Sequence, residues 1–344
     1  MSQRHSQRTP KISRMNSAEN ANKIFSEEQV VEQKVDEGDD RDVDFHEIEG
    51  SLHMINWQDC LAQLSSDIIE YQSNAEASDW SFMKPAIIQY LFTICIRLRL
   101  PNEVRYTAAL IFNVYMRRQI MQLYQFLEDQ DMSAAQKSRE WEKIETNAER
   151  QIPLRLLSAV QISSKIHSYH DSLSSRQVVN CLRSLSLPYT LSAVQNSEIR
   201  VFRTIGHKPP ESPLTVCETA IKILAYSMRK HGWADDSKFD MIWQHVLVVL
   251  DVCMINHADL YDKFMARRPR NNFSAKDDPA VVLAKFKWDF LMLSISVIQT
   301  AILCVIGRSC LPLISKVLVK ILHCDERNCQ LLHESIVEMI EERR

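Results

Sequence analysis

Glycine is nearly absent from this chain, with five among 344 residues. Phosphate-binding loops, dinucleotide-binding turns and nucleophile elbows need glycine for positive φ or for close backbone approach, and none of their motifs occurs. Tight β-hairpins favour Asn-Gly or Asp-Gly, and neither dipeptide is present. The sequence therefore predicts an all-α protein, and no catalytic motif in it indicates an enzyme.

The first 50 residues differ from the rest in composition, with seven basic and twelve acidic residues. Such a segment cannot bury enough apolar area to offset its conformational entropy, so we predict a disordered charged tail over 1–50. Thr9, before Pro10, is a possible phosphorylation site for a proline-directed kinase or a chance dipeptide. Because the whole chain carries a net charge of −3, the remainder carries +2, which is too weak to indicate direct nucleic-acid binding.

From residue 51 onward, apolar residues recur with helical spacing between turn signals. The pattern predicts one leading helix, five further helices, a proline-rich joint at 206–213, and five more helices. The leading helix and first set are expected at 52–71, 85–98, 104–127, 154–168, 175–185 and 191–205. The second set is expected at 214–230, 239–265, 279–307, 313–323 and 326–341.

These patterns divide the chain into three parts. The tail covers 1–50, the leading helix and first set cover 51–208, and the second set covers 209–344. The polar segment at about 128–150 is predicted to be a solvated insertion or helical extension within the first set.

Several residue clusters suggest other sites, and each has a simpler interpretation. The uncharged stretch 290–307 approaches membrane-spanning length, but its polar residues favour a buried central helix, and no membrane is expected. Nine cysteines at irregular spacing favour a reducing intracellular compartment over disulfides. The spacing of His323, Cys324, Cys329 and His333 fits ordinary helix packing better than zinc, so no metal or other cofactor is expected.

The stretch LRLLSAVQISSKIHS, residues 154–168, places a lysine at the end of an apolar run. Leucine, valine and isoleucine alternate there with serines small enough for close helix packing. Lysine is rarely buried without a partner, so Lys165 is expected to emerge from a core helix opposite a group that pairs with it.

The arrangement of two five-helix sets, each with its most apolar helix third, resembles two consecutive boxes of the cyclin family. The segment 154–168 is similar to the third cyclin-box helix, which ends in Ala/Ser-Ser-Lys. The segment SEIRVFRTIGHKPPESPL, residues 197–214, is similar to the fifth helix and the stretch that follows it. The resemblance is strongest over 153–223, extends over 81–118, and is architectural beyond residue 230.

This resemblance implies a cyclin-dependent kinase as partner. It implies that Lys165 on the third helix pairs with Glu198 on the fifth, beside an apolar surface that packs on the kinase. That surface would be formed by Ile162, Ile166, Ile199 and Phe202. The residues alone leave a second interpretation open, in which the pair is an intramolecular surface salt bridge of little energetic weight.

Several positions depart from the pattern of cell-cycle cyclins, and Ile166-His167-Ser168 follows the lysine where two acidic residues are usual. Lys84 and Asn113 stand where an arginine and an aspartate are usual, while Tyr90 and Pro153 replace the tryptophan and glutamine of the substrate-docking groove. With the insertion at 128–150, these departures make the chain most similar to the meiotic, crossover-site-associated cyclin N-terminal domain-containing proteins. The similarity implies a regulator in the nucleus, on meiotic chromosomes, with recombination proteins as further partners.

Two alternatives to a kinase-binding regulator remain open from the sequence. The fold could serve a kinase-independent scaffold that recruits recombination factors through other surfaces. It could also serve a nucleic-acid binder like the cyclin-box transcription factors, although that class needs a basic stripe that a nearly neutral body does not favour.

Overall fold

A computed structural model describes most of the chain after the tail, in five segments: residues 51–73, 81–168, 171–230, 236–268 and 278–343. Within these segments the structure has thirteen helices and no strand, which confirms the all-α prediction there. The predicted tail over 1–50, with Thr9, lies outside the described residues.

In the part of the first set that the structure describes there are five helices after the leading one, as predicted. They are α3 (Pro85–Arg97), α4 (Asn102–Glu128), α5 (Ala134–His167), α6 (Ser175–Ser184) and α7 (Leu191–Thr204). Helix α5 contacts all four others, and its residues from Leu154 to Ser164 are buried. Serine lets α5 approach α4 closely, because the Ser163 hydroxyl donates to the Val104 carbonyl oxygen at 2.9 Å.

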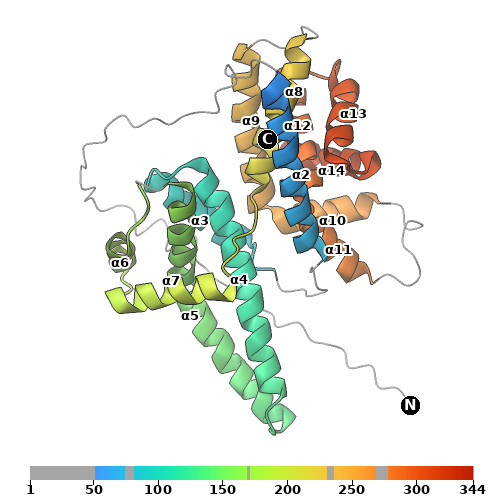
Figure 1. Ribbon diagram of the computed structural model, residues 1–344. Helices are drawn as coiled ribbons and strands as arrows, with labels where there is room; N and C mark the ends of the chain where they lie inside the picture. The colour runs from blue at the N-terminus through green and yellow to red at the C-terminus, as the bar shows by residue number, and fades with distance from the viewer. Residues whose placement is uncertain (1–50, 74–80, 169–170, 231–235, 269–277, 344) are drawn as a thin grey trace, which may run out of the picture.

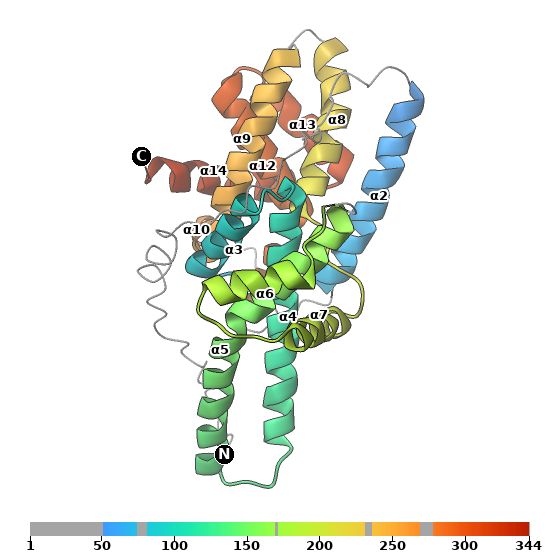
Figure 2. The same cartoon turned by 90° about the vertical axis from the view of Figure 1, so that its left-hand side faces the viewer.

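The polar segment at 128–150 is mostly helix. The C-terminal half of α4 and the N-terminal half of α5 run side by side and project from the body as a two-helix arm (Figures 1 and 2). Ser133 caps α5 in a capping box with Gln136, and α5 continues through Pro153. The expected start at Leu154 is therefore wrong, and the helical extension is the alternative that the structure supports.

Among its described residues, the second set contains seven helices where five are predicted. They are α8 (Pro213–Lys230), α9 (Asp236–Ile255), α10 (His257–Arg267), α11 (Pro279–Lys287), α12 (Phe290–Val305), α13 (Leu311–Leu322) and α14 (Glu326–Glu341). Two expected helices are each broken, with an 88° bend between α9 and α10 and a 60° bend between α11 and α12. The second set thus differs from the predicted five-helix repeat.

Polar residues lie at both breaks. At the end of α9, the backbone N–H and the side-chain amide of Asn256 both donate to the Val252 carbonyl oxygen, at 3.1 Å and 2.8 Å, and the Asn256 side chain does not cap α10. Asp289 accepts from the Met292 backbone N–H at 2.9 Å and so starts α12 as its N-cap.

Helix α12 is the buried centre of the second set. It is buried from Phe290 to Ile302 and contacts α8, α9, α13 and α14, as expected for a central helix of this composition. Within the described residues, no single helix has both the length and the apolar character to cross a membrane, although the two bent pairs reach that threshold when joined.

The leading helix α2 (Ser51–Ser73) packs on the second set, although it precedes the first set in sequence. It lies beside α8 and also contacts α11 and α12 (Figure 1). Leu61, Leu64 and Ile68 are buried, and the Lys222 ammonium lies 4.2 Å from the centre of the Trp57 ring. The leading helix therefore covers the α8 side of the second set.

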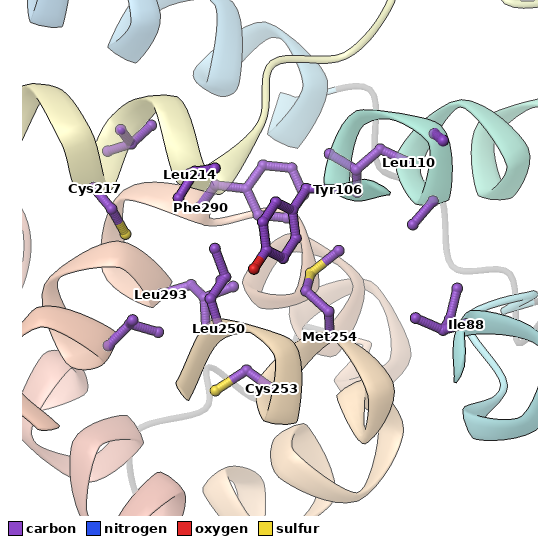
Figure 3. Packing of buried hydrophobic residues seen from close by; sticks show 14 of the residues in the cluster. Ile88, Tyr106, Leu110, Leu214, Cys217, Leu250, Cys253, Met254, Phe290 and Leu293 are labelled. Carbon is purple, nitrogen blue, oxygen red and sulfur yellow. The ribbon is translucent and has the colours of Figure 1, made fainter. Parts of the chain in front are cut away.

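The two sets share one continuous hydrophobic core. Tyr106 and Leu110 of α4 point toward Leu250 and Met254 of α9 and toward Phe290 of α12 (Figure 3). Helix α4 thus links the sets, because one of its faces packs on α5 and another reaches the core of the second set.

Candidate protein-binding site

Lys165 and Glu198 meet at the surface of the first set. The Lys165 ammonium nitrogen lies 2.5 Å from Glu198 Oε1, joining the last turn of α5 to the middle of α7. The Lys165 side chain is 46% exposed and that of Glu198 is 16% exposed, so the lysine faces solvent and covers the carboxylate. The structure brings together the two residues that the resemblance pairs.

A buried polar contact beneath the pair fixes how α5 and α7 pack. The Ser158 and Ser197 hydroxyl oxygens are 2.7 Å apart, and Arg155 donates to Ser197 Oγ at 2.6 Å. The three side chains are buried, and Ser197 directly precedes Glu198. Buried hydrogen bonds form only at particular distances and angles, so these contacts fix the position of α7 along α5. They therefore hold Glu198 opposite Lys165.

Three of the four predicted apolar residues are exposed next to the pair. Ile166 is 48% exposed, Ile199 is 53% exposed, and Phe202 is 36% exposed. Ile166 and Ile199 directly follow the paired residues in sequence, and Phe202 lies one helical turn after Glu198 on the same face of α7. We call Lys165, Glu198, Ile166, Ile199 and Phe202 the docking surface.

Ile162 does not belong to this surface. It is only 4% exposed and is part of the hydrophobic core, so its predicted place on the outer face is corrected. The reason is helical geometry, since Ile162 shares the inward face of α5 with Ser158 and Ala159. It supports the docking surface from beneath.

The end of α7 fixes one edge of the docking surface. Gly206 adopts φ +79° just after the helix, and a β-carbon there would lie 3.5 Å from a guanidinium nitrogen of Arg118. Arg118 donates to the Thr204 carbonyl oxygen at 3.1 Å, and the His207 ring lies edge-on to Phe202 with centres 5.1 Å apart. This turn restricts the orientation of the Phe202 ring.

The departures from cell-cycle cyclins at Lys84, Asn113, Tyr90 and Pro153 lie in the first set. Asn113 accepts the Phe82 backbone N–H at 3.1 Å, and Lys84 precedes α3 as its N-cap residue. Tyr90 is half-buried, and burial raises its pKa to about 12. Pro153 lies inside α5, where it removes one backbone donor.

The histidine and cysteine cluster near the C-terminus takes part in helix packing. His333 Nδ1 lies 2.9 Å from the Thr300 hydroxyl oxygen, and burial lowers the pKa of His333. Cys329 is buried, and the Cys324 thiol contacts the Leu322 carbonyl oxygen. In the part of the chain that the structure describes, no group of three or more His, Cys, Asp or Glu side chains is placed to hold a metal ion.

Sequence reasoning missed a polar cluster between the two sets. Arg105 Nε lies 3.0 Å from Asp251 Oδ1, and the Tyr106 hydroxyl donates to the same oxygen at 2.7 Å. Burial raises the pKa of Asp251 despite the nearby guanidinium, and it raises the pKa of Tyr106 as well. The signal was present, because Asp251 is an isolated acid within the apolar run VLVVLDVCM.

Two known proteins are similar to this chain in sequence. Cyclin N-terminal domain-containing protein 1 of Homo sapiens is 23% identical over 251 residues, which cover 71% of this chain and 72% of that protein. The chain resembles cyclin-like proteins. The Mus musculus protein of the same name is 21% identical over 245 residues, which cover 71% of each chain. No protein-family model matches the chain.

The similarity to cyclin N-terminal domain-containing protein 1 covers most of the chain and agrees with the all-helical structure. Cyclin-like proteins are generally regulatory rather than catalytic. The likeness therefore directs attention to surfaces that bind another protein, and the docking surface combines exposed apolar side chains with an oriented ion pair.

Proposed function

We propose that this chain is a non-catalytic, cyclin-like regulatory subunit that binds a cyclin-dependent kinase through the docking surface. The observation that carries the proposal is the 2.5 Å contact between Lys165 and Glu198, flanked by exposed isoleucine and phenylalanine side chains. An ion pair at the rim of an apolar patch combines area for burial with directional hydrogen bonding. These are the features that specific protein interfaces use.

The surroundings of the pair favour a binding role over a surface salt bridge alone. An isolated exposed pair contributes about 0–1 kcal/mol to stability and does not require large apolar neighbours. Here Ile166 and Ile199 are each about half exposed. A partner that covered them would remove apolar surface from water. It would also exclude solvent from the nearby ion pair and so strengthen the attraction between its two charges.

The proposed mechanism is a shift in a conformational equilibrium of the kinase. Kinases are active when a mobile helix places its glutamate against the ATP-binding lysine. A rigid surface that binds this helix only in its active position increases the population of the active state. Helices α5 and α7 supply that rigidity, since the Ser158–Ser197 contact joins them below the docking surface.

The resemblance to the cyclin N-terminal domain-containing proteins supports a proposal about the biological setting. We place the complex in the nucleus, on meiotic chromosomes, where it would promote crossover formation together with recombination proteins. Restriction of expression to germ cells, with localisation of the protein to chromosomes, is the observation expected.

Co-purification with a panel of cyclin-dependent kinases tests the proposal. At least one kinase should be retained by the wild-type chain and lost with Lys165→Glu, because this change places two carboxylates opposite each other. Lys143→Glu is the matched control, since Lys143 pairs with Glu140 on the exposed arm, in the same helix but far from the docking surface along it. The control should retain the kinase.

Failure has a clear form. If no kinase of the panel is retained, or if Lys165→Glu and wild type retain it equally, the docking surface does not bind a kinase. A chain that still supported crossovers with Lys165→Glu would then act as a kinase-independent scaffold.

A further inference from the structure

A cavity of about 240 Å³ lies at the base of the two-helix arm, where α7 packs across α4 and α5 (Figure 1). Gln151 and Arg155 of α5 and Arg200 of α7 line its polar end. A single water needs about 10–15 Å³ of such space, so the cavity has room for a polyatomic ligand.

Arg155 is a buried cation whose partners are all neutral. The residue is 6% exposed, and its guanidinium donates to Ser197 Oγ and to Gln151 Oε1, both at 2.6 Å. The guanidinium also lies 5.6 Å from the centre of the Tyr115 ring. A buried charge in a protein is usually paired with an opposite charge. In the segments that the structure describes, no carboxylate forms an ion pair with Arg155, so its counter-charge is missing from the fold.

Arg200 brings a second positive charge to the same cavity. It is exposed on α7 and forms no ion pair with any described residue. Burial lowers the pKa of Arg155, and the nearby charge of Arg200 lowers that pKa as well. None of the residues that line the cavity, all of them in described segments, is acidic. An anion in the cavity would therefore offset the repulsion between the two arginines.

Gln151 adds a neutral donor between the charges. Its Oε1 atom accepts from Arg155, and a guanidinium has no acceptor, so the amide oxygen and not the NH₂ group must face the arginine. The NH₂ group of Gln151 is left to serve the cavity. Guanidinium and amide donors together suit the oxygens of a phosphate, which carries about two negative charges as a monoester.

The other end of the cavity is apolar. Ile120 and Leu123 of α4 and Ile144 of α5 line it, and along both helices these residues lie nearer the tip of the arm than Arg155 does. Ile120 is buried, while Leu123 and Ile144 are half-buried. A ligand that fills the cavity therefore needs a charged end and an apolar end.

We propose that this cavity binds the phosphate group of a monoester whose organic part is apolar, either a small aryl phosphate or a phosphorylated tyrosine side chain of a partner protein. The phosphate oxygens accept from Arg155, Arg200 and Gln151. The organic part lies against Leu123 and Ile144. The exposed position of Arg200 leaves the polar end open to solvent, which gives the ligand a path of entry.

Calorimetric titration of the full chain with phenyl phosphate tests the site. Gln151→Glu is the sharpest variant, because its carboxylate keeps the oxygen that accepts from Arg155 and supplies the missing counter-charge from within the protein. It should weaken phenyl phosphate binding about tenfold or more, while urea unfolding shows a stability equal to or above that of wild type. Gln195→Glu is the matched control, since Gln195 is exposed on α7 and does not line the cavity. This control should bind as wild type does.

A second pair of variants tests the exposed arginine. Arg200→Gln should also weaken phenyl phosphate binding about tenfold or more, because it removes a charged donor. Arg203→Gln removes the same charge from an exposed position of the same helix that does not line the cavity, and its affinity should stay within about twofold of wild type.

Two further probes identify the ligand. Inorganic phosphate should bind about threefold or more weakly than phenyl phosphate, because it leaves the apolar end unfilled. A phosphotyrosine peptide that binds more tightly than phenyl phosphate supports a phosphorylated partner, and one that does not supports a small molecule. The proposal is overturned if neither ester binds at millimolar concentration, if Gln151→Glu or Arg200→Gln leaves the affinity unchanged, or if inorganic phosphate binds as tightly as phenyl phosphate.

Discussion

Two ion pairs show how differently charge is used in the two regions of this molecule. Lys165–Glu198 lies on the outer face of the first set, with a lysine that is 46% exposed and exposed apolar neighbours. Arg105–Asp251 lies between the sets, with side chains that are 10% and 29% exposed and a tyrosine hydroxyl on the same carboxylate. Their distances, 2.5 Å and 3.0 Å, do not distinguish their roles.

The two ion pairs differ in their exposure to solvent and in the groups that surround them. Water screens the charges of the outer pair, so removing the pair should change the free energy of unfolding little. A protein that covered this surface would bind a pair whose side chains are already oriented. The inner pair is satisfied within the fold, and loss of one member leaves a buried charge. The first pair is therefore expected to matter for binding and the second for stability.

The largest expected effect is on the inner pair. Arg105→Met should lower the free energy of unfolding by about 3 kcal/mol, because it leaves the Asp251 carboxylate partly buried without its cation. The double variant Arg105→Met, Asp251→Leu should recover most of this loss. Urea unfolding followed by circular dichroism measures both, and equal stability of the single variant and wild type would contradict the assignment.

The next effect depends on pH and involves His257, also between the sets. Its imidazole has a pKa of about 3 when folded against 6.5 ordinarily, so between these values the unfolded state binds more protons. Stability should therefore fall by about 2 kcal/mol as the pH drops from 6.5 to 5. The free energy of unfolding of wild type and of His257→Phe, measured against pH in buffer without phosphate, checks this. The decrease in stability that His257 causes between pH 6.5 and pH 5 should be absent in the variant.

A smaller loss of stability is expected when the Tyr106 hydroxyl is removed and the ion pair is kept. Tyr106→Phe removes the donor to Asp251 at 2.7 Å and the oxygen that accepts from Arg105 at 3.0 Å, but it keeps the contact between Arg105 and Asp251. It should cost about 1–2 kcal/mol of unfolding free energy, less than Arg105→Met. A loss equal to that of Arg105→Met would show that the tyrosine, not the arginine, compensates the carboxylate.

The smallest effect is expected on the outer pair. Lys165→Met should change the free energy of unfolding by less than about 1 kcal/mol, because the lysine is half exposed. Thermal unfolding beside Lys143→Met, a change in the exposed arm, provides the comparison. A loss of several kcal/mol would mean that the outer pair is structural, and the contrast between the two pairs would fail.

Much of the fold could be predicted from local sequence patterns. Near-absence of glycine and helical spacing of apolar residues predicted an all-α chain, and the uncharged stretch at 290–307 predicted the buried centre of the second set. The breaks before His257 and before Phe290 were missed, because continuous apolar spacing does not reveal a bend between two consecutive helices. The start of α5 was expected at Leu154, with a helical extension before it as one alternative; the helix begins at Ala134, after a capping box that Ser133 and Gln136 form and that the sequence carries.

The candidate site was predictable only in part. The pairing of Lys165 with Glu198, 33 positions apart, came from resemblance, since helical periodicity relates residues within one helix and not between two. The burial of Ile162 could have been inferred from its place on the α5 face that carries Ser158. The Arg105–Asp251 contact, 146 positions apart, depends on how the two sets pack, which local patterns do not specify.

The most direct test of the central claim measures affinity and stability on the same variants. For a kinase retained by the wild-type chain, Lys165→Glu should weaken binding about 30-fold or more, equivalent to about 2 kcal/mol, while its unfolding free energy changes by less than about 1 kcal/mol. Unchanged affinity, or a loss of affinity matched by an equal loss of stability, would contradict a docking role for this surface.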